Sequence, residues 1–146
     1  MGFTISGVTH WSIPVNDLAE SERFYRDVLG LEYRGRLGDS RMACFTVGGH
    51  YILLCERNEP LRRTPAQDNR LHHAFHLAPA DWVEALRTLH RHGIRPAEPI
   101  VYREHGVFPG AEVYFLDPSG NLLELRNPEW RPGMPRPSFE EIVGAV

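Results

Sequence analysis

Hydrophobic and polar positions follow the same order twice along this chain. Residues 8–30 begin with an alternating segment, VTHWSIPV, that predicts a strand, and continue with an apolar repeat of helical period. Asp17 with Glu20 three residues later predicts a capping box at the start of that helix, and Gly30 predicts its end. Residues 71–93 repeat this order, with LHHAFHL as the strand. The chain is therefore expected to contain an internal repeat.

Each copy continues with three further strand-like segments, so the repeated unit is predicted to be β-α-β-β-β. The polar segment 57–70, which contains two prolines, predicts a linker between the copies. The segments GGHYILLCE and SGNLLELRN align, so that Gly49 matches Gly120. The predicted segments are 31–37, 41–47 and 49–56 in the first copy, and 95–103, 111–117 and 121–127 in the second.

We expect one domain over residues 1–146, of the α+β class, built from two βαβββ modules. Neither module can bury its sheet face alone, so the two are expected to form a curled mixed sheet around a cleft. Open edge strands favour further pairing, either within one chain or between two. The tail 128–146 is rich in proline and is expected to lie irregularly on the surface, with Ser138 and Glu141 capping a last helical turn. The modules span about 7–56 and about 71–127.

Composition narrows the function classes. Lys and Arg number 16 against 19 Asp and Glu, and no basic block occurs, so nucleic acid is not the expected partner. The sequence contains no run of 18 apolar residues, so no membrane span is expected. The first residues lack the pattern of a secretory signal, so a cytoplasmic protein is expected. Cys44 and Cys55 have no CxxC spacing and are expected to be free, buried thiols.

Candidate metal ligands occupy matched positions in the repeat. His10 lies in the first strand of one copy, and His72 lies at the same place in the other. Glu124 falls inside the apolar run GNLLELRN, where a carboxylate is costly unless a positive charge lies beside it. A metal ion would supply that charge. The alternatives are structural histidines and an ion pair between Glu124 and Arg126. Strand alternation places His76 on the same face as His72.

The stretches THWSIPVNDLAESERFYRDVLGLEY, LHHAFHL and VYFLDPSGNLLEL, in this order and spacing, resemble the vicinal oxygen chelate superfamily over about residues 7–127. This superfamily includes glyoxalase I, fosfomycin-resistance and bleomycin-resistance proteins, and type I extradiol dioxygenases. The resemblance implies one divalent metal ion, Fe(II) or Mn(II) first and Ni(II) or Zn(II) second, held by His10, His72 and Glu124. Such a site keeps a net charge of about +1 and suits a small-molecule substrate that chelates through adjacent oxygens, one of them anionic. Members of this length are usually homodimers.

Within the superfamily, the chain is most similar to the extradiol dioxygenases, which implies a metal-dependent dioxygenase. That family places a catalytic His and Tyr about 19 and 10 residues before the Glu ligand, and His105 and Tyr114 match these positions. The chain departs from the family because no second acid–base histidine lies between His50 and His72, and because typical members are about twice as long.

Other branches give the alternatives. The position that would carry a fourth glyoxalase I ligand is Leu53, which cannot bind a metal. Fosfomycin-resistance enzymes have a similar length and place polar substrate contacts where Ser12 and Tyr114 lie, but VYREHGVFPGAE lacks the Ser- and Gly-rich cation loop of their thiol-transferase branch. His76 is expected to line the substrate cleft. A non-catalytic protein that binds a small molecule, such as an antibiotic, is the third alternative.

Overall fold

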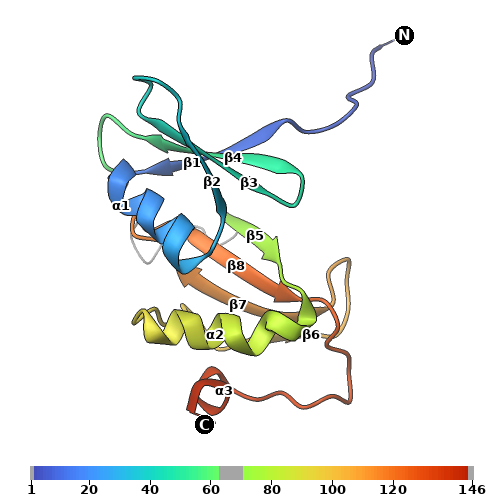
Figure 1. The fold of residues 1–146 in the computed structure, drawn as a ribbon. Coiled ribbons are helices and arrows are strands. Elements are labelled where there is room, and N and C mark those ends of the chain that lie inside the picture. Colours follow the sequence, from blue (N-terminus) through green and yellow to red (C-terminus); the bar gives the residue numbers. More distant parts are fainter. Residues whose placement is uncertain (1, 63–70, 145–146) are drawn as a thin grey trace. The chain divides into compact units, whose positions relative to one another are not determined.

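The computed structural model describes residues 2–62 and 71–144, which form two compact units, one ending at Arg62 and the other formed by the remainder (Figure 1). Part of the predicted linker, 63–70, lies outside the described residues. The first unit contains β1 (His10–Val15), α1 (Leu18–Arg23), a π-helical turn η1 (Phe24–Val28), β2 (Glu32–Arg36), β3 (Met42–Val47) and β4 (His50–Glu56). The second contains β5 (His72–His76), the 3-10 turn η2 (Pro79–Asp81), α2 (Trp82–Arg91), β6 (Val101–Arg103), β7 (Gly110–Leu116), β8 (Leu122–Asn127) and α3 (Phe139–Gly144).

The two sheets have the same topology. Among the described residues, each sheet has four strands, in the orders β1-β4-β3-β2 and β5-β8-β7-β6. The first strand of each module pairs in parallel with the last, and the other neighbours are antiparallel. This confirms the predicted α+β fold of two βαβββ modules. His10 and His72 each begin an edge strand, so the repeat places them at equivalent positions.

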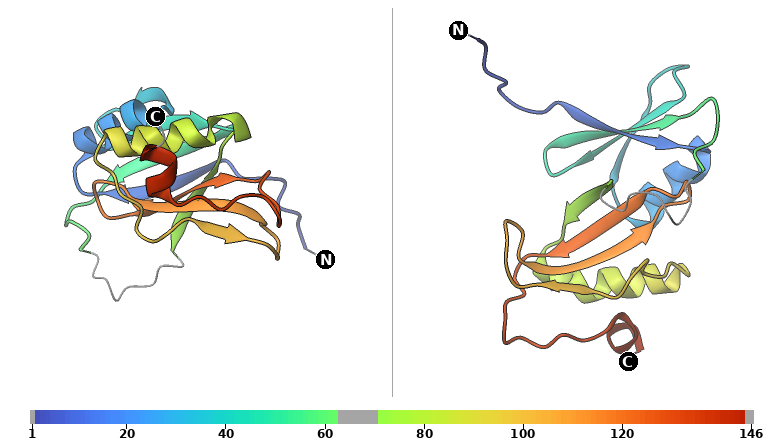
Figure 2. Two further views of the ribbon diagram at one scale, coloured as in Figure 1. Left: turned by 90° about the horizontal axis from the view of Figure 1, so that it is seen from below. Right: turned by 180° about the vertical axis from the view of Figure 1, so that it is seen from behind.

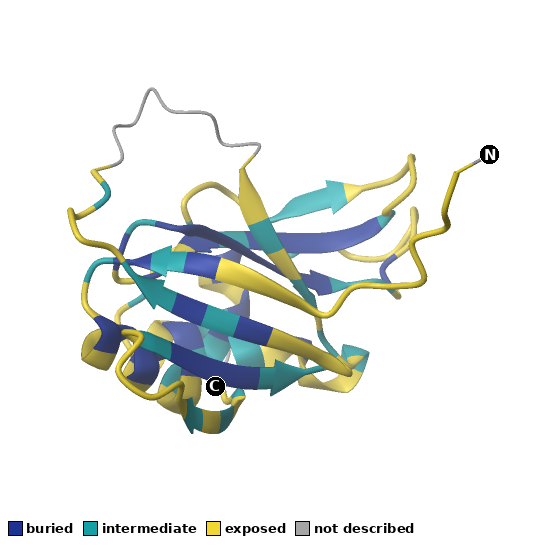
Figure 3. Cartoon of the chain, turned by 90° about the horizontal axis from the view of Figure 1, so that it is seen from above, coloured by how far each residue is buried: buried dark blue, intermediate teal, exposed yellow. Residues whose placement is uncertain are grey.

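Each sheet has one strongly apolar face, and a helix of the same unit lies along it (Figures 1 and 2). The strands alternate between buried and exposed positions, which gives the banding in Figure 3 and follows the period of two that strands impose. Removing these apolar side chains from water is the main driving force for folding of each unit. The most buried are Ile13, Val15, Tyr25, Phe45 and Leu54 in the first unit, and Leu86, Leu89, Val113, Phe115 and Leu123 in the second.

The first helix begins and ends where its sequence predicts. Asp17 is extended and its Oδ1 accepts the backbone N–H of Glu20 at 2.8 Å, which confirms the predicted cap. Glu56, at the end of β4, accepts the N–H of Leu18 at 2.8 Å and ties the start of the helix to the sheet. Gly30 has φ +69°, a left-handed conformation that ends the helical segment with little strain.

The predicted strand 95–103 is wrong for its first six residues, because β6 covers only Val101–Arg103. Pro96 and Pro99 have no N–H to donate to a neighbouring strand. Between them, the N–H of Ala97 donates to the carbonyl of Tyr114 at 2.7 Å, so the chain touches β7 at one point before it pairs as β6.

The C-terminal tail is irregular up to Ser138, as predicted, but it is not confined to the surface. Trp130 is only 4% exposed, and its ring lies 5.1 Å from that of Tyr102. The Tyr102 hydroxyl donates to the Pro137 carbonyl at 2.5 Å, which holds the tail against β6. Ser138 Oγ accepts the N–H of Glu141 at 3.1 Å and starts α3, as predicted.

The cysteines and the lengths of the helices can be compared with what the composition predicts. Cys44 is buried, Cys55 is partly buried, and both are free thiols. The longest helix in residues 2–62 and 71–144 is α2, with 10 residues, and none there is long and apolar enough to span a bilayer.

Replacing Asp17 with Ala should lower the free energy of unfolding by about 1 kcal/mol, because the Glu20 N–H loses its acceptor. The measurement is urea denaturation at pH 7, followed by circular dichroism. Asp17→Asn keeps a side-chain oxygen and should retain most of the stability. If Asp17→Ala is as stable as Asp17→Asn, the cap does not hold the helix in place.

Candidate functional site

The turn between β7 and β8 determines where β8 begins. The buried Asp117 accepts the backbone N–H of Ser119 at 2.9 Å, that of Asn121 at 2.8 Å and the Asn121 side-chain amide at 2.8 Å. Gly120 has φ +84°, which a residue with a side chain rarely adopts. This hydrogen-bonded turn starts β8 at Leu122 and thereby fixes the position of Glu124.

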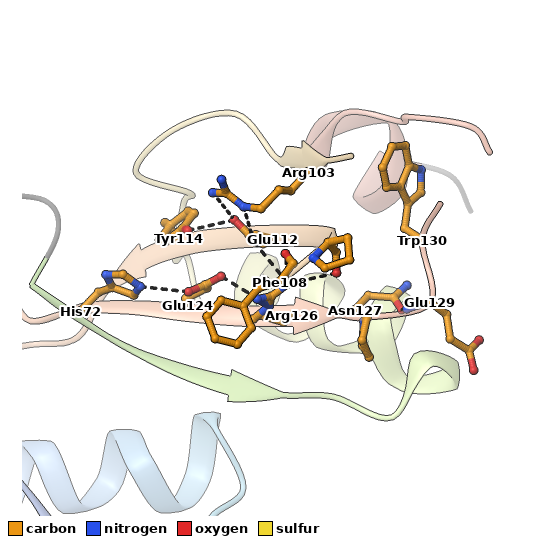
Figure 4. A network of polar contacts seen from close by, with 12 residues as sticks. His72, Arg103, Phe108, Glu112, Tyr114, Glu124, Arg126, Asn127, Glu129 and Trp130 are labelled. Atoms are coloured by element: carbon orange, nitrogen blue, oxygen red, sulfur yellow. Dashed lines mark hydrogen bonds and ion pairs between the residues drawn. The ribbon is translucent and has the colours of Figure 1, made fainter. Parts of the chain in front are cut away.

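One face of the second sheet carries a row of polar side chains (Figure 4). In the register of the sheet, Glu124 lies between Ala74 of β5 and Tyr114 of β7. One step further along β8, Arg126 lies between His76 of β5 and Glu112 of β7. Because alternate residues of a strand share a face, these side chains project from the face opposite the apolar core.

His72 and Glu124 form the centre of this row. Their Nε2 and Oε2 atoms are 3.1 Å apart, and the Glu124 side chain is only 4% exposed. Two ligands bonded to one octahedral ion at about 2.1 Å, and at right angles to each other, are about 3.0 Å apart. The pair therefore has the donor atoms and the separation of two adjacent metal ligands. Burial raises the pKa of Glu124, as does the charge of Glu112, so a nearby cation would stabilise its ionised form.

A second carboxylate on this face is held by two arginines. Glu112, 1% exposed, accepts from Nε and Nη2 of Arg103 at 2.9 and 3.0 Å and from the Tyr114 hydroxyl at 2.9 Å. Arg126 lies between the two carboxylates, with Nη2 3.4 Å from Glu112 and Nε 3.7 Å from Glu124. The face thus alternates acidic and basic groups, which reduces the cost of burying them.

The network shifts the ionisation of its members. Burial alone would raise the pKa of Glu112, but hydrogen bonds from Arg103 and Tyr114 and the charges of Arg103 and Arg126 outweigh it and lower that pKa. Burial, together with the hydrogen bond to Glu112, raises the pKa of Tyr114 well above its ordinary value. Tyr114 therefore remains a protonated phenol at neutral pH, and its hydroxyl is a donor.

The other residues predicted for the site lie in different surroundings. The ring centroids of Tyr114 and His72 are 5.6 Å apart, so Tyr114 lies next to the candidate ligands. His76 is exposed at the end of β5 on the same face. His105 lies in the loop between β6 and β7, where its side chain is 89% exposed and its Nε2 is 3.7 Å from the Glu104 carboxylate. In residues 2–62 and 71–144, no hydrogen bond or ion pair joins His105 to the row on the sheet.

In the first unit, His10 and Ser12 are exposed on β1, on the face opposite the buried Ile13 and Val15. Leu53 of β4 is the register partner of Ser12 and is half-buried. Within either unit, no three His, Cys, Asp or Glu side chains among the described residues form a metal-binding group. His10 as the third ligand remains a prediction.

Sequence reasoning missed Glu112 and Arg103, and treated Arg126 only as an alternative partner of Glu124. Glu112 and Tyr114 are two positions apart, so strand alternation puts them on one face, but the arginines that neutralise Glu112 come from β6 and β8. The sequence signal for Glu112 was its position as a charged residue within the apolar run GAEVYFL.

A cavity of about 530 Å³ lies elsewhere in the second unit, between the segment 95–102 and the tail residues 136–140. Its lining includes Arg95, Tyr102 and Arg136, and none of the residues predicted for the metal or substrate site. It is therefore separate from the polar face of the sheet.

The chain belongs to the glyoxalase/bleomycin resistance protein/dioxygenase superfamily, whose sequence model matches residues 7–125. This confirms the resemblance to the vicinal oxygen chelate proteins. The chain is 27% identical over 121 residues to glutathione transferase FosA of Serratia marcescens, covering 83% of this chain and 80% of that protein. It is also 27% identical over 121 residues to metallothiol transferase FosB of Staphylococcus haemolyticus, with 83% of each chain covered.

Solved structures agree on the fold. The fosfomycin resistance protein FosX of Listeria monocytogenes superimposes with a TM-score of 0.66 at 23% identity, covering 84% of this chain and 91% of FosX. At this identity the likeness shows a shared fold of paired βαβββ modules.

Replacing Glu112 with Gln should lower the free energy of unfolding by about 3 kcal/mol at pH 7, because the buried Arg126 loses an ionised partner. The folded-state pKa of Glu112 is lowered, so its contribution is complete above the unfolded pKa, about 4.3, and is lost as pH falls through the folded value. The stability difference between the two proteins should thus be constant from pH 6 to 8 and shrink in acid.

The matched control is Glu84→Gln, which removes an exposed partner of Arg91 on α2 and should change stability little. Chemical denaturation over a pH series measures both variants. Equal stability of Glu112→Gln and the unchanged protein at pH 7 would show that the network does not stabilise the sheet.

Proposed function

We propose that this protein is a metal-dependent enzyme that uses a divalent ion, held by His10, His72 and Glu124, to activate a small anionic substrate for attack by a thiol. The observation that carries the proposal is the buried Glu124 carboxylate, 3.1 Å from His72 Nε2. The 27% identity to two thiol transferases over 83% of the chain supports thiol transfer as the reaction class.

The charges of the second unit favour an anionic substrate. Glu112 and Glu124 are matched by Arg103 and Arg126, so this face is close to neutral. A divalent ion would leave it positive, which attracts an anion such as a phosphonate. When bound, the ion would act as a Lewis acid that polarises a substrate oxygen. The similarity to metallothiol transferase FosB supports a metal requirement.

The proposed reaction is opening of a strained ring such as the epoxide of fosfomycin. The thiol sulfur forms a bond to a ring carbon, the carbon–oxygen bond of the ring breaks, and the thiol proton ends on the released oxygen. The Tyr114 ring lies next to His72, and the raised pKa of its phenol keeps the hydroxyl protonated at neutral pH. Ser12 and His76 are proposed to contact the substrate, since each is exposed on the face that carries a candidate ligand.

An extradiol dioxygenase remains the second candidate, because Tyr114 lies 5.6 Å from the His72 ring, where that family implies a substrate contact. Two observations favour thiol transfer over it. The His105 side chain is 89% exposed in its loop, and the Tyr114 hydroxyl already donates to Glu112. A glyoxalase I site is less favoured, since Leu53 supplies no fourth ligand.

One divalent ion per chain is expected in the purified protein, and Glu124→Ala should remove it, because the variant loses a charged ligand. The measurement is mass spectrometry of metals in dialysed protein. Glu129→Ala is the control, since Glu129 is exposed in the same unit and should leave the metal content unchanged. Retention of the ion by folded Glu124→Ala would contradict the assignment.

Light scattering on the same samples tests the proposed homodimer against the chain mass of 16.7 kDa.

The Mn(II)-loaded protein should convert fosfomycin and glutathione, or fosfomycin and cysteine, to a product with the summed mass of both reactants. Glu124→Gln should reduce the rate at least about hundredfold, or about 2.7 kcal/mol of barrier. The protein could instead take up oxygen with a panel of catechols, and His105→Phe could lower that uptake at least tenfold at unchanged metal content. This result would show that the reaction is that of a dioxygenase and not thiol transfer. Tight binding of a small molecule without turnover would indicate a binding protein.

A further inference from the structure

The two oxygens of Glu124 have different surroundings (Figure 4). Oε2 faces His72 Nε2 at 3.1 Å. Oε1 faces Arg126 Nε at 3.7 Å, which is longer than a hydrogen bond. The carboxylate therefore presents one oxygen to the candidate metal ligand and the other to a guanidinium.

Arg126 is fixed from the side away from Glu124. Its Nη2 donates to the carbonyls of Phe108 at 2.6 Å and Pro109 at 3.2 Å, and lies 3.4 Å from Glu112. Its guanidinium carbon lies 5.2 Å from the centroid of the Phe108 ring. Arg126 is 6% exposed, so the guanidinium cannot turn to solvent.

The Nε–H of this fixed guanidinium is a buried donor without an acceptor among the described residues. Buried donors are nearly always paired in folded proteins, so such a group calls for a specific explanation. Glu124 Oε1 lies 3.7 Å from this Nε, and a shift of the carboxylate by less than 1 Å would bring the two within about 3 Å.

We infer that Arg126 is a positioning residue for the metal ligand Glu124: its Nε–H binds Oε1 when Oε2 ligates the ion. This orientation leaves one oxygen for the metal and one for the arginine, so Glu124 binds through a single oxygen. The inference rests on the proposed metal site. Groups that orient a metal ligand in this way contribute about 10–100-fold to metal affinity.

Two substitutions separate positioning from charge. Arg126→Lys keeps the positive charge but places a methylene where Nε lies in arginine, so it removes the donor. Arg126→Met removes the charge as well. If Arg126 acted on the ion only through its charge, Arg126→Met would bind a dication more tightly, because a neighbouring positive charge is lost. Positioning requires both variants to bind it more weakly.

The affinities for Zn(II) and Mn(II) are measured by competition with a fluorescent chelator, in proteins shown by circular dichroism to be folded. We expect a loss of about 10–100-fold for Arg126→Lys and Arg126→Met. Arg91→Met, which changes an exposed arginine of α2 in the same unit, should leave the affinity unchanged. Unchanged or tighter binding by both Arg126 variants would overturn the inference while leaving the metal site intact.

A second measurement follows Arg126 in the unchanged protein, and Arg126→Lys serves only to assign the resonance. The Nε–Hε resonance of Arg126 in ¹⁵N-labelled protein, assigned by its absence in Arg126→Lys, should move downfield and exchange more slowly with water when Zn(II) is added. An unmoved resonance in protein that binds Zn(II) would refute the role of Arg126. Failure of the unchanged protein to bind Zn(II) or Mn(II) would instead refute the metal site, and the inference with it.

Discussion

The Glu124 carboxylate lies buried on a β-strand, between the His72 imidazole and the Arg126 guanidinium, and the rest of the candidate site follows from this burial. An ionised group removed from water must be compensated by nearby charge. Arg126 supplies part of that compensation, Glu112 then balances Arg126, and Arg103 balances Glu112. The hydrogen-bonded turn at Asp117 holds the strand in the register that makes these contacts.

The internal repeat relates His10 of the first module to His72 of the second. Because both modules have one topology, His10 and His72 begin equivalent edge strands. At the position of Glu124 the first copy has Leu53, so only the second copy carries a carboxylate there. The chain belongs to the glyoxalase/bleomycin resistance protein/dioxygenase superfamily, and its similarity to two thiol transferases supports the proposed reaction class. The second module is therefore predicted to supply two metal ligands and the first a single histidine.

Elements with local signals could be predicted from the sequence, and contacts set by strand register could not. Asp17 and Gly30 determine the ends of the first helical segment through neighbours in the chain. The repeat and the family resemblance selected His72, and the apolar run around Glu124 selected that carboxylate, while their role as metal ligands stays a prediction. The pairing of Glu112 with Arg103 and Arg126 depends on how β6, β7 and β8 align, and no spacing in the sequence reports it. The error at residues 95–100 was avoidable, because two prolines there oppose a strand.

The central claim is that His10, His72 and Glu124 bind one divalent ion. Anomalous diffraction from crystals grown with Mn(II) tests it most directly, because the difference map locates the ion independently of activity. One peak per chain is expected, about 2.0–2.3 Å from a nitrogen of each of the two histidines and from one oxygen of Glu124, with no ligand from the strand that contains Leu53. A peak bound by other side chains, or no peak in crystals of folded protein grown with Mn(II), would contradict it.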